Sequence, residues 1–257
     1  MLLNPEYLLA VFLIFSRIGG VFVAAPFFSH PAIQVRLRIF IAVLMAWVLV
    51  ALIPVSLPPF ALTPVGVVLC VFIEVLTGTL LGFTCRIIFW MVQFFAQTIG
   101  FQMGLSLAQA FNPMEGTSTT PLGRLLSIVM IIMFLLLDGH HHILQGLVFS
   151  FHGIPLAGAN VSGGAELLLG WMGALFMSAL QLCAPFMVTF FLLESCLGIF
   201  ARVVPQADLF SISLPLKLLL GLILFGIFMS DFFPILPNLF DGMAIDMLKM
   251  IEAIMPS

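Results

Sequence analysis

The sequence predicts an all-α, membrane-embedded protein of about six to eight kinked or interrupted hydrophobic helices. Of the 257 residues, 63% are hydrophobic and only 7% are charged, whereas about a quarter of the residues in an average soluble domain are charged. The mean hydropathy of +1.28 agrees with this. Several apolar runs also approach the roughly 20 residues that a helix needs to cross a bilayer. We expect one domain over residues 1–257, because neither a linker nor a convincing internal repeat divides the chain.

The first three hydrophobic helices are predicted over Tyr7–Phe28, Leu37–Ile53 and Val65–Phe83. Arg17 interrupts the first run in its middle, and a Ser-His-Pro turn follows it. Between the second and third runs the chain carries four prolines within a stretch without charges, and this density of proline forbids one continuous helix there. The prolines are Pro54, Pro58, Pro59 and Pro64.

The fourth apolar run, Ile87–Leu105, follows the third after only three residues, none of which favours a turn. One long bent helix and a very tight hairpin both fit this join. The next run, Leu125–Leu137, is too short to span alone. It is interrupted by Asp138, Gly139 and three histidines, His140–His142, before Ile143–Phe151 continues it weakly.

Two long apolar runs are predicted near the C-terminus. Leu167–Leu193 is the longest clean run, and Pro185 should kink it. Leu216–Phe233 is the last run, and we expect the mildly amphipathic stretch Asp241–Ser257 to form a separate tail. Basic residues should alternate between the loops of a simple bilayer protein, but the alternation slips at Ile87–Leu105. The slip favours a subunit packed into a larger helical assembly, where neighbouring protein covers short or broken helices.

Several classes of function find no support in the sequence. No basic run could hold nucleic acid, and no phosphate-binding glycine motif is present.

The four cysteines, all in apolar segments without a CxxC pair, indicate buried free thiols. Three consecutive histidines point in different directions on a helix, so we expect polar residues at a helix break and no metal, although Asp138 could bond His142 four residues away. We expect no cofactor and no enzymatic activity, since no catalytic constellation appears. The cysteines are Cys70, Cys85, Cys183 and Cys196.

Charges inside apolar runs are costly and are therefore functional candidates. A secondary transporter could use Glu74 and Glu194 with Arg17 as a partner, and an intramembrane protease would need a role for Asp138 or Asp231. The structural alternative is a set of ion pairs within this chain or with partner chains. The candidates for such pairing are Arg17, Glu74, Arg86, Glu194, Arg202, Lys217 and Asp231.

The most distinctive polar stretch is the segment 106–121, SLAQAFNPMEGTSTTP. Small and hydroxylated residues give it freedom to move, and its apolar side chains could seal a pore by hydrophobic contact. An ordinary surface loop with a turn at Asn112-Pro113 is the alternative. The candidate plug residues are Leu107, Phe111, Asn112, Pro113 and Met114.

The chain also resembles a known family through a set of motifs in fixed order. GFQMGLS at 100–106, followed by Asn112-Pro113, Pro121 and Arg124, is similar to the signature region of the FliR family, whose virulence-system counterparts are called SctT. The break at 138–140 and the LPL motif at 214–216 are similar to family landmarks as well. The other matching positions are Arg17, Pro26, Pro31, Arg36, Gly198, Arg202, Pro205 and Gln206.

The resemblance implies a subunit of the flagellar type III protein-export gate. Family members assemble with FliP-like and FliQ-like subunits into a hetero-oligomeric helical ring, contact an FlhB-like protein and membrane lipid, and pass unfolded flagellar proteins. The implied location is the bacterial inner membrane, in the flagellar basal body, with the gate partly displaced toward the periplasm. The segment 106–121 resembles the plug loop of the family, with Phe111 at its tip.

Overall fold

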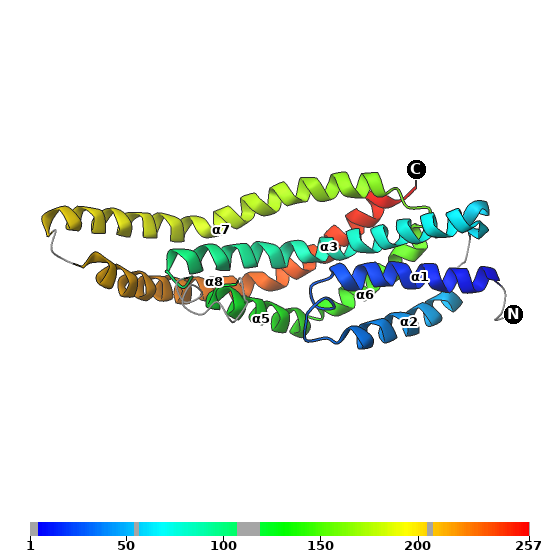
Figure 1. Cartoon of the computed structure of the whole chain (residues 1–257), viewed down its shortest axis with the longest axis horizontal. Helices are drawn as coiled ribbons and strands as arrows, with labels where there is room; N and C mark the ends of the chain where they lie inside the picture. The colour runs from blue at the N-terminus through cyan, green and yellow to red at the C-terminus, as the bar shows by residue number, and fades with distance from the viewer. Residues whose placement is uncertain (1–4, 54–56, 107–118, 205–207, 257) are drawn as a thin grey trace. The chain divides into compact units, whose positions relative to one another are not determined.

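The computed structural model describes residues 5–53, 57–106, 119–204 and 208–256. Within these residues the chain forms seven α-helices and one short 3₁₀ helix and contains no β-strand (Figure 1), so the predicted all-α class is confirmed. Five of the helices are long and apolar enough to cross a membrane, or up to six if a bent pair counts as one. The elements are α1 (Pro5–Ala24), α2 (Val35–Leu52), η1 (Pro59–Leu62), α3 (Pro64–Gln102), α5 (Pro121–Leu136), α6 (Gly139–Gly153), α7 (Val161–Val203) and α8 (Leu209–Ile254).

Four of the helices start at a side chain that accepts a hydrogen bond from a backbone N–H three residues later. This is the usual N-cap, which satisfies one of the N–H groups that the first turn leaves without a partner. Thr63 precedes Pro64 of α3, and Thr120 precedes Pro121 of α5. Proline at the first helical position suits both helices, because its missing N–H would have had no partner there. The other two caps are Asn160 before α7 and Asp208 before α8.

Two of the long helices, α3 and α8, are continuous where the sequence pattern suggested a possible or actual interruption. Residues 64–102 form one helix, α3, so Ile87–Leu105 does not fold back as a tight hairpin. The prediction of a separate C-terminal tail is wrong, because α8 continues from Leu209 to Ile254 through three internal prolines. Each proline removes only one intrahelical hydrogen bond, and the apolar residues on both sides keep the helix intact. The three are Pro215, Pro234 and Pro237.

The predicted break at residues 138–142 begins at the junction of α5 and α6, whose axes differ in direction by 66°, and residues 139–142 form the first turn of α6. Asp138 occupies the break with a left-handed backbone (φ 55°). Asp is among the few residues that tolerate this conformation. The following Gly139 is buried, and a Cβ atom there would lie 2.3 Å from the ring of Phe134. Glycine therefore allows α6 to begin directly against α5.

The chain divides into two compact units, each with its own contacts. Unit 1 comprises residues 1–88, 134–173 and 239–257, and within it α1 and α2 lie side by side and run in opposite directions (Figure 1). Its core includes Phe134, whose ring centroid lies 5.6 Å from that of Phe240. Gly146 of α6 faces Met247 of α8 closely enough that a Cβ would meet its sulfur at 2.4 Å.

Unit 2 comprises residues 89–133 and 174–238 and is built around phenylalanine rings. Phe95 of α3 contacts Phe186 of α7 and Phe228 of α8, with centroid distances of 5.4 and 4.5 Å. Offset and edge-to-face contacts of this kind stabilise a core beyond the area that they bury. The aromatic cluster thus joins three helices of this unit, while the single-domain organisation of the whole chain stays a prediction.

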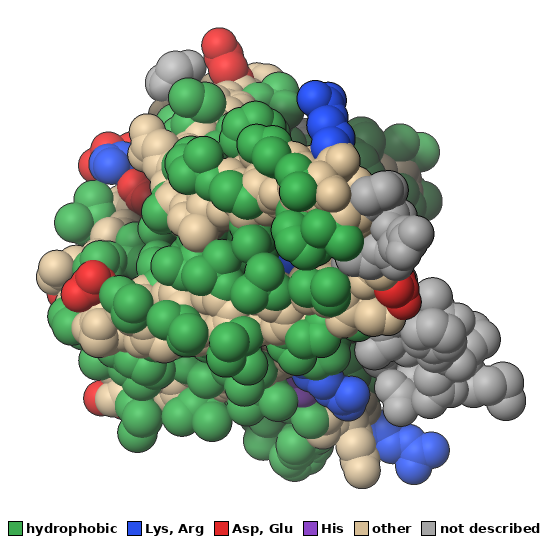
Figure 2. Space-filling view, turned by 90° about the vertical axis from the view of Figure 1, so that its left-hand side faces the viewer, with side chains coloured by type: hydrophobic (Ala, Val, Ile, Leu, Met, Phe, Trp, Pro, Cys, Tyr) green, Lys and Arg blue, Asp and Glu red, His purple; other side chains and the backbone are tan. Residues whose placement is uncertain are grey.

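Large apolar faces of the helices are not covered by this chain. The most apolar stretches of α7 and α8 are only 17% and 6% buried. Figure 2 shows one face of the molecule, on which hydrophobic side chains cover most of the surface and charged ones are few. Contiguous exposed apolar surface on this scale marks contact with lipid or with other proteins.

Candidate functional site

The candidate site in unit 1 starts from a close crossing of α1 and α3 at glycines. A Cβ atom on Gly78 would lie 2.0 Å from the backbone oxygen of Arg17, and a Cβ on Gly20 would lie 2.6 Å from the oxygen of Val75. Real Cβ atoms do not approach backbone so closely, hence the two helix backbones touch only because these positions lack side chains. This contact places Arg17 and the following turn of α1 directly against the turn of α3 that carries Glu74.

Arg17 and Glu74 form a two-pronged ion pair with no exposure of either side chain. Nε of Arg17 donates to Oε2 of Glu74 at 2.5 Å, and Nη2 donates to Oε1 at 3.0 Å. The planar guanidinium matches a carboxylate in this geometry, which makes the pair both strong and directional. The predicted pairing of Arg17 with a carboxylate is thus found within the chain itself.

Arg17 also binds the C-terminal end of α6. Its Nη1 donates to the backbone oxygens of Ser150 and Ile154, each at 3.2 Å, and Nη2 adds a bond to Ile154 at 3.3 Å. The last carbonyl groups of a helix lack intrahelical partners and carry partial negative charge, so a cation there is favourable. The guanidinium carbon also lies 4.4 Å from the centre of the Phe151 ring, a distance typical of cation–π contacts.

Glu74 fixes the connection between α6 and α7. Its Oε1 accepts a hydrogen bond of 2.7 Å from the backbone N–H of Ala157. Ala157 has a left-handed backbone (φ 59°), which is uncommon for a residue other than glycine and costs roughly 1–2 kcal/mol. The carboxylate therefore has both oxygens engaged, and the ion pair ties α1 and α3 to the α6–α7 connection.

The other predicted charges lie apart from this cluster. Arg86 of α3 donates to the backbone oxygen of Ala24 at 3.4 Å, at the end of α1. In unit 2, Lys217 of α8 bonds Glu194 of α7 at 2.5 Å, with 22% and 52% of their side chains exposed. In the part of the chain that the structure describes, Arg202 and Asp231 are exposed and form no ion pair. Each unit thus contains one ion pair between two of the predicted charges, Arg17–Glu74 in unit 1 and Lys217–Glu194 in unit 2.

The candidate plug residues fall within 107–118 and lie outside the described residues, whereas both flanks of the segment are described. On the first flank, Gly104 has a left-handed backbone (φ 78°). The N–H of Gly104 bonds the oxygen of Phe101, and the N–H of Leu105 bonds the oxygen of Gly100, both at 3.0 Å. These two bonds form a Schellman motif, which ends α3 and satisfies its last carbonyls.

The second flank is attached to the same end of α3. Thr120 is fully buried, and its backbone N–H donates to Oε1 of Gln97 at 3.1 Å. Its hydroxyl oxygen accepts from Gly123 and so caps α5. A Cβ on Gly100 would lie 2.5 Å from this hydroxyl, so glycine allows the close approach. Both ends of the segment therefore meet at the last two turns of α3.

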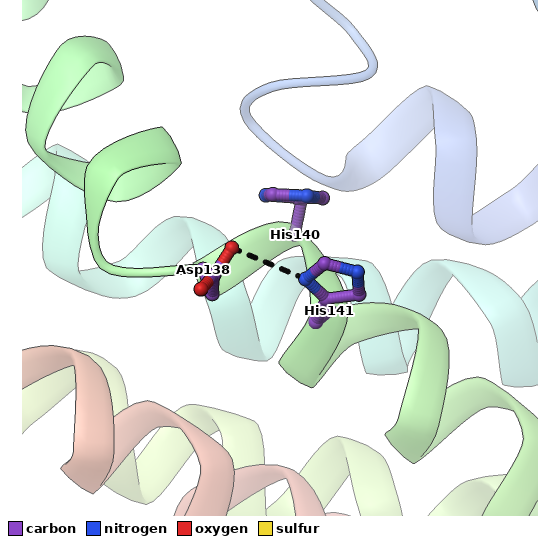
Figure 3. A group of neighbouring side chains, drawn as sticks. All are labelled: Asp138, His140 and His141. Atoms are coloured by element: carbon purple, nitrogen blue, oxygen red, sulfur yellow. Dashed lines mark hydrogen bonds and ion pairs between the residues drawn. The ribbon is translucent and has the colours of Figure 1, made fainter.

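The polar residues at the α5–α6 break form a small group (Figure 3). Nδ1 of His141 lies 3.2 Å from Oδ1 of Asp138, and the rings of His140 and His141 are 4.3 Å apart. The bond from Asp138 to His142 that the spacing permits is not the one observed, because Asp138 precedes α6 with a left-handed backbone and the helical i, i+4 spacing does not apply. Among the described residues, only Asp138, His140 and His141 offer three ligand atoms within 4.8 Å of one another.

All four cysteines are free thiols, as the sequence predicts. Cys70, Cys85 and Cys183 are buried, but Cys196 of α7 is exposed, which corrects the prediction that all four are buried. The apolar neighbours of Cys196 in the sequence suggested a core position, whereas α7 turns most of this stretch away from the rest of the chain.

Sequence reasoning missed the partners that complete these sites. Ser150, Ile154 and Ala157 act through backbone atoms, for which side-chain patterns give no signal. Gln97 and Thr120 were also missed, although threonine directly before proline is a typical start of a capped helix.

The chain matches a known family and its members over most of its length. The family described as bacterial export proteins, family 1, matches residues 8–243. The flagellar biosynthetic protein FliR of Bacillus subtilis is 31% identical over 235 residues, which cover 90% of each chain. FliR of Escherichia coli is 28% identical over 87% of this chain and 85% of its own. The surface presentation of antigens protein SpaR of Shigella sonnei is 27% identical over 86% and 85%.

The long apolar helices and the buried ion pair define a polytopic helical membrane protein, whose exposed faces are suited to lipid or to other subunits. The chain belongs to the bacterial export proteins, family 1, in which its relatives include proteins of flagellar biosynthesis. It is thus a membrane-embedded component of protein export.

Proposed function

We propose that this chain is a subunit of the flagellar type III export gate, where it assembles with FliP-like and FliQ-like subunits and contacts an FlhB-like protein. The observation that carries the proposal is the family match over residues 8–243, together with FliR relatives that align over most of both chains. The gate passes unfolded flagellar proteins. This chain has a structural and channel-forming role in it and no enzymatic one. Its place is the bacterial inner membrane, in the flagellar basal body, with part of the gate displaced toward the periplasm.

The exposed apolar faces support an assembled state. α7 and α8 leave most of their apolar surface uncovered, and the polar side chains of Glu194 and Lys217 lie on it. An ion pair exposed to hydrocarbon would be costly, so neighbouring protein or water must cover this surface. Packing against other helical subunits provides such a cover, and it also explains the irregular alternation of charges along the sequence.

We assign the segment 106–121 the role of a plug that closes the pore when no substrate passes. The hydrogen bonds of Gly104 and Thr120 support this role, since they hold both ends of the segment at one end of α3. A loop anchored at two adjacent stems can move between its ends without disturbing the helices that carry it. Apolar residues of the segment, Phe111 foremost, would block ions by excluding water from a narrow constriction.

The transporter alternative loses support at Glu74. The carboxylate is fully buried and already accepts three hydrogen bonds, two from Arg17 and one from Ala157, which favours a structural role over the binding of a substrate or coupling ion. Glu194, the other carboxylate of that hypothesis, is bonded to Lys217 in unit 2.

The subunit role is tested by native mass spectrometry of this chain produced together with its FliP-like and FliQ-like neighbours. We expect one discrete assembly that contains a single copy of this chain. A chain that remains alone, or forms only homo-oligomers while its neighbours are present, would contradict the proposal.

The plug role is tested by replacing residues 107–118 with a glycine-serine linker of equal length. Cells carrying this variant should leak ions and still export flagellar proteins. The matched control is the linker variant with Phe111 restored at its position, which should reduce the leak. Loss of export without any ion leak would contradict the plug assignment but would not bear on the subunit role.

A further inference from the structure

An open apolar groove of about 420 Å³ lies on unit 1 between α1, α2 and the first part of α3. It is lined by Phe15, Gly19 and Val23 of α1, Ile39 of α2 and Val75 of α3, and Arg38 is the single charged residue in its wall. The lining residues of α1 span eight positions, which corresponds to about 12 Å along the helix. The groove is therefore long and narrow enough for an alkyl chain and carries a cation at the start of α2.

Nε of Arg38 has no hydrogen-bond acceptor among the residues that the structure describes. The side chain of Arg38 is half-buried, and its Nε is buried. Within the described part of the chain, neither Arg38 nor the exposed Arg36 pairs with a carboxylate. A buried donor left without an acceptor is destabilising, and more so when it is charged. An anion at this place would remove that cost.

The start of α2 favours an anion as well. Gln34 occupies the N-cap position without a side-chain hydrogen bond, and the first turn has no acidic residue. The first N–H groups of an 18-residue helix are thus available, and they carry partial positive charge. Arg38 lies in that same turn and lines the groove, so its charge and the helix terminus act at the same end of the groove.

The groove itself suits an acyl chain better than a peptide. Its only hydroxyl groups, those of Ser16 and Thr79, already donate to the backbone oxygens of Phe12 and Val75 in their own helices. An extended peptide would bring a backbone N–H and C=O group at every residue into a groove whose hydroxyl groups are engaged and in whose wall Nε of Arg38 is the donor without an acceptor, so most of these groups would lose their hydrogen bonds. An acyl chain has no such groups.

We propose that this groove binds one anionic phospholipid, with its phosphate at Arg38 and one acyl chain between α1, α2 and α3. Basic pockets between membrane helices hold lipid headgroups by the same combination of charge and burial. The phosphate accepts a hydrogen bond from Nε of Arg38, which has no acceptor among the described residues, and the acyl chain covers the apolar wall. This inference needs only a membrane-embedded chain and does not depend on the gate assignment.

The test uses the full chain in a mild detergent, with phosphatidylglycerol and phosphatidylcholine of identical acyl chains added in equal amounts. Native mass spectrometry counts the lipids that stay bound. We expect one phosphatidylglycerol per chain, and Arg38→Gln should lower its affinity about tenfold, equivalent to about 1.4 kcal/mol. Arg124→Gln is the matched control, since Arg124 is an exposed arginine of α5 in unit 2, and it should retain the lipid.

A second variant tests the acyl-chain part of the site. Gly19 has open space where its Cβ would stand, so Gly19→Leu should fill the groove and displace the lipid without a clash. Gly170→Leu, at another helical glycine with open space, is its control. Thermal unfolding of both variants shows whether they fold alike.

Four outcomes would overturn the proposal. Equal retention of the two lipids would show that the headgroup charge is irrelevant. Equal loss in Arg38→Gln and Arg124→Gln would show that Arg38 is no special site. Displacement by inorganic phosphate, with Gly19→Leu binding normally, would assign the site to a free anion. If Gly19→Leu prevents assembly with other subunits yet keeps its lipid, a partner helix occupies the groove.

Discussion

Arg17 is bonded to Glu74, 57 residues further along the chain, and neither side chain has any exposure to solvent. The same guanidinium also holds the last carbonyl groups of α6. The pair therefore joins α1, α3 and α6 at one point, and its removal should destabilise all of unit 1.

Breaking this ion pair should be strongly destabilising. Arg17→Ala or Glu74→Ala leaves one buried charge without a partner, which costs about 3–5 kcal/mol. The joint replacement Arg17→Met with Glu74→Leu removes both charges and should cost less than either single change. Thermal unfolding in detergent measures all three variants.

The control for this series is Lys249→Ala, which removes an exposed ion pair with Asp246 in the same unit. Exposed pairs contribute little, so the melting temperature should hardly change. A double variant less stable than both singles would show that the pair does not act through its charges.

Filling the contact between α1 and α3 should separate the helices. In Gly78→Ala the new methyl carbon would lie 2.0 Å from the backbone oxygen of Arg17, which is far too close. Overpacking of this kind lowers the free energy of unfolding by about 1–3 kcal/mol. Gly170→Ala, at a helical glycine with open space around it, should be neutral or stabilise by up to about 1 kcal/mol. Equal melting temperatures for the two variants would contradict the close crossing.

The stem of the segment 106–121 should depend on the hydroxyl of Thr120. Thr120→Val keeps the shape of the side chain but removes the cap of α5, at a cost of about 1 kcal/mol. Thr120→Ser retains the hydroxyl and should restore most of the stability. Thr189→Val is the control, because that exposed hydroxyl only bonds its own helix. Hydrogen exchange at the start of α5 should rise in Thr120→Val alone.

The four cysteines should differ in their reaction with N-ethylmaleimide. Cys196 is exposed and the other three are buried, so the isolated chain in detergent should be modified first at Cys196. Peptide mass spectrometry over a time course locates the label. Cys196→Ala should remove the fast phase, and fast labelling of Cys85 in that variant would contradict its burial.

Much of the fold follows from the sequence because its helix signals are local. Thr63-Pro64 and Thr120-Pro121 mark two helix starts, and Asp138-Gly139 marks the break between α5 and α6. The continuity of α8 was missed because proline weakens a helix without always ending it. Whether a helix continues past Pro234 is decided by packing, which no local pattern reports.

The site was predictable only as a set of charges. The cost of a buried charge singles out Arg17 and Glu74, but their pairing depends on glycines that let α1 and α3 touch. Contacts between residues so far apart in sequence leave no local pattern. The same limit applies to the partner of Asp138, because the bond to His141 depends on the backbone turn that precedes α6.

The distance in sequence between Arg17 and Glu74 constrains how the protein enters the membrane during synthesis. An arginine at the centre of a lone transmembrane helix raises the free energy of insertion by about 2.5–3.5 kcal/mol. The carboxylate that neutralises Arg17 leaves the ribosome 57 residues later. We therefore expect α1 to be held stably in lipid only once α3 has been made.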